Sequence, residues 1–217
     1  MFPPSSPPLT PELLLRGYMS GIFPMAESRT DPEVFWVDPK RRGILPLDGV
    51  HVSRSLRKTM RTCSYRLSLD TSFAAVVDGC ADRDETWINA GIYDTYIDLH
   101  QMGYAHSIEL WEETHLVGGV YGVAIAGAFF GESMFSRSPD ASKIALVCLA
   151  AHLRTCGFAL FDTQFVTPHL HSMGALEISR DDYRSRLKDA LSVEATLDRQ
   201  PLPETPAAFL APQGRTP

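Results

Sequence analysis

The stretch LVGGVYGVAIAGAFFGESMFS, residues 116–136, decides how the rest of this chain is organised. Its two halves, 116–125 and 128–136, are apolar and rich in Val, Ile and Phe, which is typical of strands. Ala126-Gly127 stands between them, where a tight turn is expected. Just before this stretch, AHSIELW at 105–111 alternates like a further strand. The sequence therefore predicts three consecutive antiparallel strands.

Helical patterns precede these strands. Residues 89–102 carry an apolar stripe at helical spacing, and Asn89 and Gly103 are placed to cap and to end that helix. Residues 53–61 predict a shorter helix with Ser53 as its N-cap. The remaining predictions for this half are short helices at 12–18 and 72–79, and short strands and turns within 33–50.

A longer helix is predicted after the strands. Ser138-Pro139 indicates an N-cap followed by proline in the first turn, and Gly157 marks a stop after Cys156. An apolar strand at 158–165 and a last helix from about Arg180 to Leu191 follow.

This order of elements predicts an α/β (α+β) fold with a mixed sheet flanked by helices. It is the order expected of an acetyltransferase-like (GNAT-like) fold. Proline-rich ends suggest four segments: a flexible arm at 1–11, a small N-terminal domain at 12–62, a catalytic domain at 63–192 and a mobile tail at 193–217.

Composition excludes some classes of protein. A net charge of −6 does not favour a general nucleic-acid binder, although charge can be local. No apolar run is long enough for a membrane span, and no signal peptide is evident. Four cysteines without metal spacing indicate reduced thiols, so we expect a cytoplasmic protein, and we expect a monomer.

Three polar residues stand out against apolar surroundings. Glu132 lies inside the Phe- and Met-rich run 127–146, and such a carboxylate needs a partner. It is expected to meet a cationic group of a ligand, to hydrogen-bond a polar group of a ligand, or to pair with Arg137 or Lys143. Asp162 and Gln164 are two apart in a predicted strand, so they point to the same face and can reach one reacting centre.

Basic residues gather in two places. Arg54, Lys58 and Arg61, helped by Arg57, fall on one face of the predicted helix at 53–61. Lys40, Arg41 and Arg42 form a second cluster. Such clusters bind phosphates without regard to sequence, or are simply solvated. His169 and His171 have the spacing of a chelate, but no third ligand follows at a fixed spacing, so no metal is expected.

Several segments together resemble the leucyl/phenylalanyl-tRNA–protein transferase family. They are GYMSGIFPM (17–25), WVDPKRRGILPL (36–47), HVSRSLRK (51–58), TWI (86–88), LHQMGYAHSIELW (99–111), LVGGVYGV (116–123), GESMFSRSPDASKIAL (131–146) and FDTQFVTPHLHSMGA (161–175). The resemblance implies a small N-terminal domain before an acetyltransferase-like domain. It implies transfer of Leu or Phe from charged tRNA to proteins that begin with Arg or Lys, which marks them for degradation, without metal or cofactor.

The resemblance also assigns roles. Asp162 and Gln164 become the catalytic pair. Asp162 holds or deprotonates the acceptor amine, directly or through Gln164 or a water, and Gln164 orients that amine or polarises the ester. The amino-acid pocket falls on apolar residues, namely Phe129, Met134, Leu146, Leu149, Val120 and Phe161. A bulky Phe161 would favour Leu over Phe. Trp36, Trp87 and Tyr96 are expected to stack on the terminal adenosine or to close a domain interface. The basic residues Arg41, Arg42, Arg54, Arg57, Lys58 and Arg61 are expected to contact tRNA.

Two other functions compete with this one. A CoA-dependent acyltransferase needs a glycine-containing turn that cradles pyrophosphate, and SMFSRSPDASK before the long helix contains no glycine. A non-catalytic adaptor that binds N-terminal Arg or Lys through Glu132 has no use for the basic helix or for Asp162 and Gln164.

Overall fold

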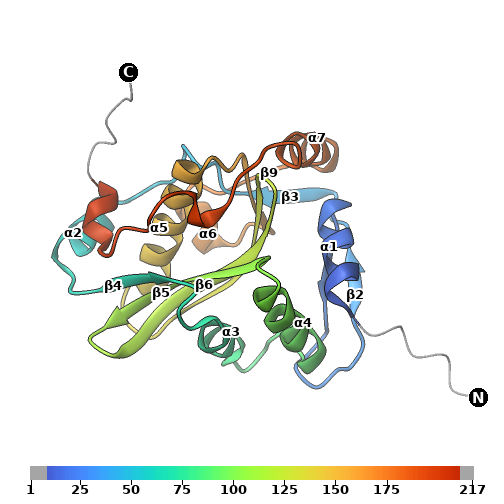
Figure 1. Cartoon of the computed structure of the whole chain (residues 1–217), viewed down its shortest axis with the longest axis horizontal. Coiled ribbons are helices and arrows are strands. Elements are labelled where there is room, and N and C mark those ends of the chain that lie inside the picture. Colours follow the sequence, from blue (N-terminus) through green and yellow to red (C-terminus); the bar gives the residue numbers. More distant parts are fainter. Residues whose placement is uncertain (1–8, 211–217) are drawn as a thin grey trace, which may run out of the picture.

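The structure is a computed structural model that describes residues 9–210 (Figure 1). The predicted arm therefore lies almost wholly outside the described residues, as does the tail at 211–217.

A seven-stranded sheet forms the centre of the molecule. Its order is β4-β5-β6-β7-β8-β3-β9, and all neighbours are antiparallel except β7 and β8. The strands are β3 (Arg41–Ile44), β4 (Arg66–Leu69), β5 (Ala105–Glu112), β6 (His115–Ile125), β7 (Ala128–Ser136), β8 (Leu160–Gln164) and β9 (Leu176–Ser179). The predicted mixed sheet and its three central antiparallel strands are confirmed.

The parallel pair is short. β7 and β8 pair at three positions, from Ala128 and Leu160 to Phe130 and Asp162, whereas β7 continues to Ser136. The two strands have no further paired residues beyond that point, so their carboxyl ends part.

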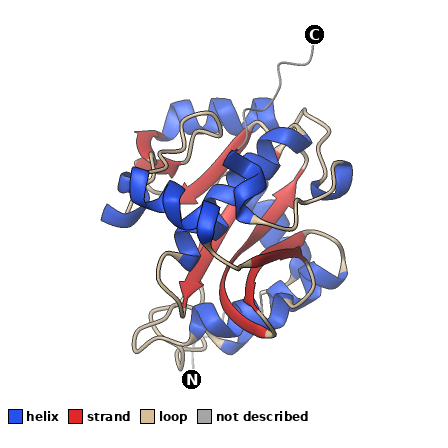
Figure 2. Cartoon of the chain, turned by 90° about the vertical axis from the view of Figure 1, so that its left-hand side faces the viewer, coloured by secondary structure: helices blue, strands red, loops and turns tan. Residues whose placement is uncertain are grey.

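Helices cover both faces of the sheet (Figures 1 and 2). The helix α5 (Ala141–Cys156) shares one hydrophobic core with α2 (Arg54–Thr62). A second core contains residues of α1 (Pro11–Met19), α3 (Phe73–Ala81), α4 (Ala90–Gln101) and α7 (Arg180–Ala190). Smaller elements complete the chain: the hairpin β1 (Phe23–Met25) and β2 (Phe35–Val37), the short helix α6 (Pro168–Ser172), and the 3₁₀ turns η1 (Leu197–Arg199) and η2 (Pro206–Leu210).

Most of the predicted helix ends are confirmed. Ser53 Oγ accepts from the Leu56 amide at 3.1 Å, and Asn89 Oδ1 accepts from the Ile92 amide at 2.8 Å. Gly157 ends α5 at φ 91°, a left-handed conformation that favours glycine.

The predicted start of α5 is wrong. Its N-cap is Asp140, at φ 62°, and the helix begins at Ala141 rather than at Pro139. The Ser138 carbonyl instead accepts from the Ala141 amide at 3.2 Å, which closes a turn ahead of the helix. A left-handed residue interrupts the helical path, so Pro139 lies outside α5.

The chain from 193 to 210, predicted to be mobile, packs against the body of the protein. Leu197 is buried in the α5 core, and its carbonyl oxygen lies 2.8 Å from His152 Nε2. The Leu67 amide of β4 donates to the Glu204 carbonyl at 2.7 Å, and η2 packs on α2. Proline-rich composition suggested mobility, but buried apolar side chains and these hydrogen bonds hold the segment.

Candidate active site

A cavity of about 780 Å³ occupies the place where β7 and β8 part. β7 contributes Glu132, Met134 and Phe135 to its wall, and the end of β8 contributes Gln164. The other lining residues come from β1, from the segment 79–87, from the start of α5, and from α6 and the loop that precedes it. They include Phe23, Met25, Asp82, Arg83, Trp87, Ser142, Phe165, His169 and Leu170. The wall combines apolar side chains with many polar ones, and two of the polar residues, Glu132 and Gln164, are hydrogen-bonded to each other.

Glu132 is the polar centre of this cavity. Its carboxylate accepts from the hydroxyls of Tyr18 at 2.7 Å and Tyr96 at 2.6 Å, and from Gln164 Nε2 at 3.3 Å. Burial raises the pKa of Glu132 to about 7, while the two tyrosine hydrogen bonds oppose that rise. A carboxyl group with this pKa exchanges protons readily at neutral pH.

The alternative pairing expected for Glu132, with Arg137 or Lys143, does not occur. Lys143 Nζ binds Asp140 at 2.8 Å instead. The Arg137 guanidinium lies over the Phe135 ring, 5.1 Å from its centroid. Glu132 therefore has no cation among its hydrogen-bond partners in the described chain.

Asp162 lies behind the cavity wall rather than in it. Its side chain is 0% exposed and does not line the cavity. Arg42 Nε donates to Oδ1 at 2.9 Å and Nη2 donates to Oδ2 at 2.5 Å, while Tyr183 and the Gln164 amide donate at 2.8 Å each. Of the routes expected for Asp162, direct contact with the acceptor amine does not fit, because its oxygens are already engaged in the interior. The route through Gln164 remains a prediction, and the Gln164 amide does donate to Asp162.

Gln164 does face the cavity. It adopts φ 54°, a left-handed conformation that is uncommon for residues with a side chain. The Asp162 carboxylate accepts from its amide and so holds this turn. Its Nε2 is thereby brought within reach of Glu132. The side chains of Asp162 and Gln164 therefore lie on different sides of the wall rather than at one point.

Arg42 is not a surface residue. It is 1% exposed, and its guanidinium lies 4.5 Å from the ring centroids of both Phe23 and Tyr183. Nη1 donates to the Gly21 carbonyl at 3.0 Å. The expected contact of Arg42 with tRNA is therefore wrong. Its neighbour Arg41 is exposed and binds Glu177.

The six residues predicted to form the amino-acid pocket lie in two different places. Met134 lines the cavity. The other five residues, Val120, Phe129, Leu146, Leu149 and Phe161, lie in the core shared with α5 and are at most 3% exposed. Phe129 and Phe161 meet edge to face at 5.4 Å. In this conformation these five residues are part of the hydrophobic core and do not line the cavity.

The three residues predicted to stack on the terminal adenosine also lie in different environments. Trp87 lines the cavity. Tyr96 is fully buried against Glu132, so its expected stacking on a base is wrong. Trp36 packs closely on α1, where a Cβ on Gly17 would stand 2.2 Å from its ring. Sequence reasoning missed Phe165, which lines the cavity and is 45% exposed; an aromatic directly after Gln164 was the available signal.

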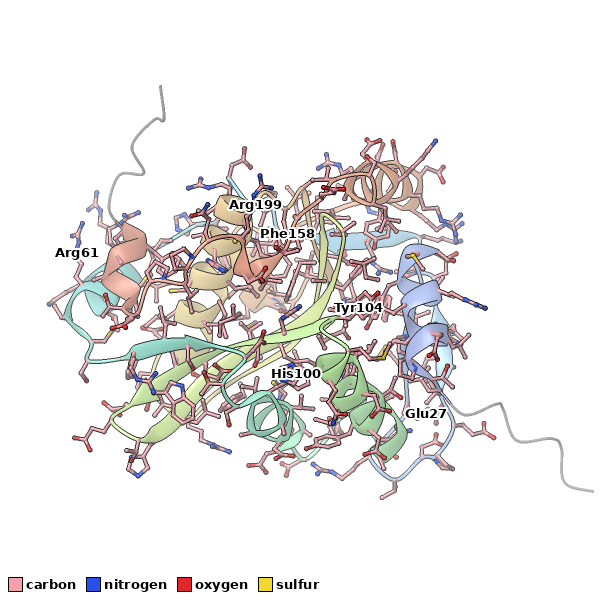
Figure 3. The ribbon with its side chains drawn as sticks, viewed as in Figure 1. Glu27, Arg61, His100, Tyr104, Phe158 and Arg199 are labelled. Carbon is pink, nitrogen blue, oxygen red and sulfur yellow. The ribbon has the colours of Figure 1, made fainter. Side chains whose placement is uncertain are left out.

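The predicted basic face of α2 is present in the structure. Leu56 and Met60 point into the core, while Arg54, Lys58 and Arg61 are exposed and Arg57 is partly so. Within residues 9–210 these four make no ion pair. Figure 3 shows Arg61 at the outer edge of the molecule.

The two histidines of α6 differ. His169 lines the cavity, whereas His171 is exposed and does not. Among the described residues, no group of three or more His, Cys, Asp or Glu side chains is arranged to hold a metal ion.

Comparisons with known proteins point in one direction. The family model described as leucyl/phenylalanyl-tRNA protein transferase matches residues 44–188, and the model of that family's N-terminal domain matches residues 8–40. A leucyl/phenylalanyl-tRNA–protein transferase of Dinoroseobacter shibae is 66% identical, over 98% of this chain and 95% of the relative. One from Cereibacter sphaeroides is 56% identical, over 97% of this chain and 98% of the relative. Among solved structures, L-PGS from Bacillus licheniformis resembles 70% of this chain and is matched over 51% of its own, at 14% identity and a TM-score of 0.40.

The matched family model defines the chain as a transferase, built on a mixed sheet with helices on both faces and a cavity where two of its strands part. Within that class the chain belongs to the leucyl/phenylalanyl-tRNA–protein transferase family, and it is an aminoacyltransferase.

Proposed function

We propose that this enzyme transfers Leu or Phe from the 3′ end of a charged tRNA to proteins that begin with Arg or Lys, which marks them for degradation. The observation that carries the proposal is the position of Glu132, whose carboxylate lies in the cavity wall and accepts hydrogen bonds from Tyr18, Tyr96 and Gln164. Its raised pKa, about 7, is consistent with this role. The names of the relatives support the donor and the protein acceptor.

Glu132 is the proton acceptor in this proposal. An N-terminal ammonium group has a pKa of about 8, so a neighbouring carboxylate can take its proton near neutral pH. The free amine attacks the ester carbonyl and forms the C–N bond. The bond from the carbonyl carbon to the ribose oxygen then breaks, and that oxygen takes up the second proton that leaves the nitrogen.

Gln164 and Asp162 have separate tasks. The Gln164 side-chain amide lies in the wall, where it can orient the amine or donate to the ester carbonyl. Asp162 is a positioning residue that acts through the Gln164 backbone. This division assigns proton transfer to Glu132 rather than to Asp162.

Apolar groups of the cavity supply binding for the donor. Met134, Met25 and Leu170 offer flexible or branched surface, and methionine adapts to side chains of different shape. Trp87 and Phe165 are the aromatic surfaces available for the adenine ring. The deeper pocket around Phe129 and Phe161 remains a prediction.

One acidic group is suited to the basic side chain of the acceptor. Asp82 lines the cavity and makes no ion pair within the described chain. The exposed face of α2 is suited to the phosphates of the tRNA, with Arg41 as a further contact.

The test is transfer of labelled Phe or Leu from charged tRNA to a peptide that begins with Arg, without ATP. A peptide that begins with Glu and a reaction with added CoA are the controls. Transfer to the Arg peptide alone supports the proposal. Tight binding of the Arg peptide without transfer would favour the adaptor, and acylation that depends on CoA would favour the CoA-dependent enzyme.

We also propose that the enzyme acts as a monomer in the cytoplasm, where charged tRNA is made. No helix within residues 9–210 has the length and apolar character needed to cross a membrane.

A further inference from the structure

Two arginine side chains in the wall of the cavity carry charges that have no carboxylate partner in the described chain. They are Arg83, in the segment 79–87, and Arg137, directly after β7. Neither forms an ion pair among residues 9–210. Both residues are exposed as well as lining the cavity, so a ligand that enters it can reach them. Their positive charges are therefore available to an anionic group.

Neutral groups around the end of β7 hold both side chains. Arg83 Nη2 donates to the Met134 carbonyl of that strand. Arg137 Nη1 donates to the Leu116 carbonyl at 3.4 Å, and its guanidinium lies over the Phe135 ring. A guanidinium group has several N–H donors, and each of these hydrogen bonds occupies a single nitrogen. The remaining donors of both arginines are available to a ligand.

The main chain on either side of Asp82 is anchored too. Arg29 Nη2 donates to the carbonyls of Ala81 and Arg83, and the bond to Arg83 is 3.1 Å long. Arg29 lies between β1 and β2, so the segment that carries Arg83 is tied to that hairpin as well as to β7. A group that is ordered before a ligand arrives loses less conformational freedom on binding.

The charges of the two substrates decide which of them the arginines suit. The acceptor of the proposed function brings an N-terminal ammonium group and a basic side chain, which positive charges repel. The donor brings backbone phosphates immediately before its terminal adenosine. Guanidinium groups match phosphate in charge and in the geometry of their paired N–H donors. The two arginines therefore suit the donor.

The position of Arg83 agrees with this match. Trp87, in the same segment, is one of the aromatic surfaces available for the adenine ring. The phosphate that precedes the adenosine is attached to the same ribose as that ring, so an adenine at Trp87 brings this phosphate toward the segment of Arg83. Asp82, also in this segment, is the group suited to the basic side chain of the acceptor. The segment thus offers one sign of charge to each substrate.

We propose that Arg83 and Arg137 bind the backbone phosphates that precede the terminal adenosine of the aminoacyl-tRNA. This inference rests on the proposed function. Such contacts position the 3′ end in the cavity without reading its bases, and they are separate from the contacts of α2 with other phosphates. Both arginines bind the substrate, and neither transfers a proton.

The experiment compares two full-length tRNA donors, each carrying Phe by chemical acylation. One has normal phosphates, and the other has neutral methylphosphonates at the last two internucleotide linkages. The wild type is expected to show kcat/KM about tenfold lower, or more, with the neutral donor, as for the loss of a charge-assisted hydrogen bond. Arg83→Gln and Arg137→Gln are each expected to lose about tenfold with the normal donor and little with the neutral donor.

Arg186→Gln is the matched control, because it removes an exposed guanidinium of α7 that does not line the cavity. It should keep the wild-type rate and the full wild-type ratio between donors. Arg83→Lys retains the charge and should keep part of that ratio, although it loses the paired N–H donors. Comparing ratios between variants cancels any difference in the intrinsic reactivity of the two donors.

Three results would overturn the assignment while transfer itself still occurs. The wild type could use the two donors alike, or an arginine variant could keep the full wild-type ratio at an unchanged rate. A variant could also lose the same factor with both donors, which would show that its arginine supports the Met134 or Phe135 wall and does not bind phosphate. Absence of transfer from the normal donor by the wild type would instead remove the proposed function, and this inference with it.

Discussion

The guanidinium of Arg42 holds both carboxylate oxygens of Asp162, at 2.9 and 2.5 Å, in a part of the interior that solvent does not reach. The pair joins β3 to β8, two neighbouring strands far apart in the sequence. It also anchors the amide of Gln164 at the point where β8 ends. One buried ion pair thus links the sheet to the geometry of the cavity wall.

Removing one partner of this ion pair should destabilise the protein strongly, and removing the second partner as well should add little to that loss. Arg42→Met or Asp162→Leu alone leaves a buried charge without its partner and should lower the free energy of unfolding by about 3–5 kcal/mol. The double variant should lose clearly less than the sum of the two, as measured by urea denaturation. Strictly additive losses would show that the two charges are not coupled. The double variant should remain slow in transfer, because Gln164 has lost its anchor.

Glu132→Gln tests the proton acceptor. Loss of a general base typically lowers the rate by about 10²–10⁴-fold. In the wild type, kcat/KM should rise through an inflection near pH 7 as Glu132 ionises, in addition to the inflection of the acceptor amine. The variant should retain only the inflection of the amine. If both inflections survive with a normal rate, Glu132 is not the base.

The same residue predicts a dependence of stability on pH. Because burial raises the pKa of Glu132 to about 7, the folded protein holds this proton more tightly than the unfolded chain, where an ordinary Glu has a pKa of about 4.3. Its contribution is complete below the unfolded value and is lost as the pH rises through 7. Relative to Glu132→Gln, the wild type should therefore become less stable between about pH 4.3 and pH 7, a trend that thermal melting can follow. A constant difference over this range would contradict the raised pKa.

The exposed face of α2 predicts binding to tRNA that depends on salt. Arg54→Ala and Lys58→Ala should each weaken binding to any tRNA sequence and reduce the slope of log K against log salt by about 1. Lys188→Ala, which removes an exposed cation of α7, is the control and should change neither. Equal effects of all three changes would mean that net charge, not this helix, attracts the tRNA. Circular dichroism would show that α2 remains folded.

The segment after α7 packs against the body of the protein, so substitutions in it should change the free energy of unfolding, although its composition suggested a mobile tail. Leu197 is 2% exposed, so Leu197→Ala should cost about 2–5 kcal/mol of unfolding free energy. Thr196→Ala, at the exposed neighbouring position, should stay within about 0.5 kcal/mol of the wild type. Similar small effects of both changes would indicate that the segment is detached in solution.

Regular patterns made much of the fold predictable. The strands on either side of Ala126 and the caps at Ser53 and Asn89 depend on local sequence, so local reasoning found them. The four-residue strands β4 and β9 carry too few residues for a period to show. The start of α5 depends on a left-handed Asp140, which no propensity rule favours over the Ser138-Pro139 signal.

The sequence indicated several residues of the site, but not how those residues are arranged. Glu132 and Gln164 stood out as polar residues in apolar strands, and both line the cavity. Arg42 could not be separated from its neighbours Lys40 and Arg41, because only the strand alternation of β3 and the distant Asp162 decide that it points inward. Phe165 and Tyr18 were missed because their contacts come from segments far away in the chain.

The hydrogen bond from the Leu67 amide to the Glu204 carbonyl has a consequence beyond the packing of the last residues. β4 is one of the two edge strands of the sheet, and such an edge offers unpaired amides and carbonyls to the strands of other molecules. The proline-rich segment occupies part of this edge, and proline cannot extend a sheet further because it has no amide hydrogen. The same prolines that suggested a mobile segment thus limit how far a strand of another molecule can pair with this edge of the sheet.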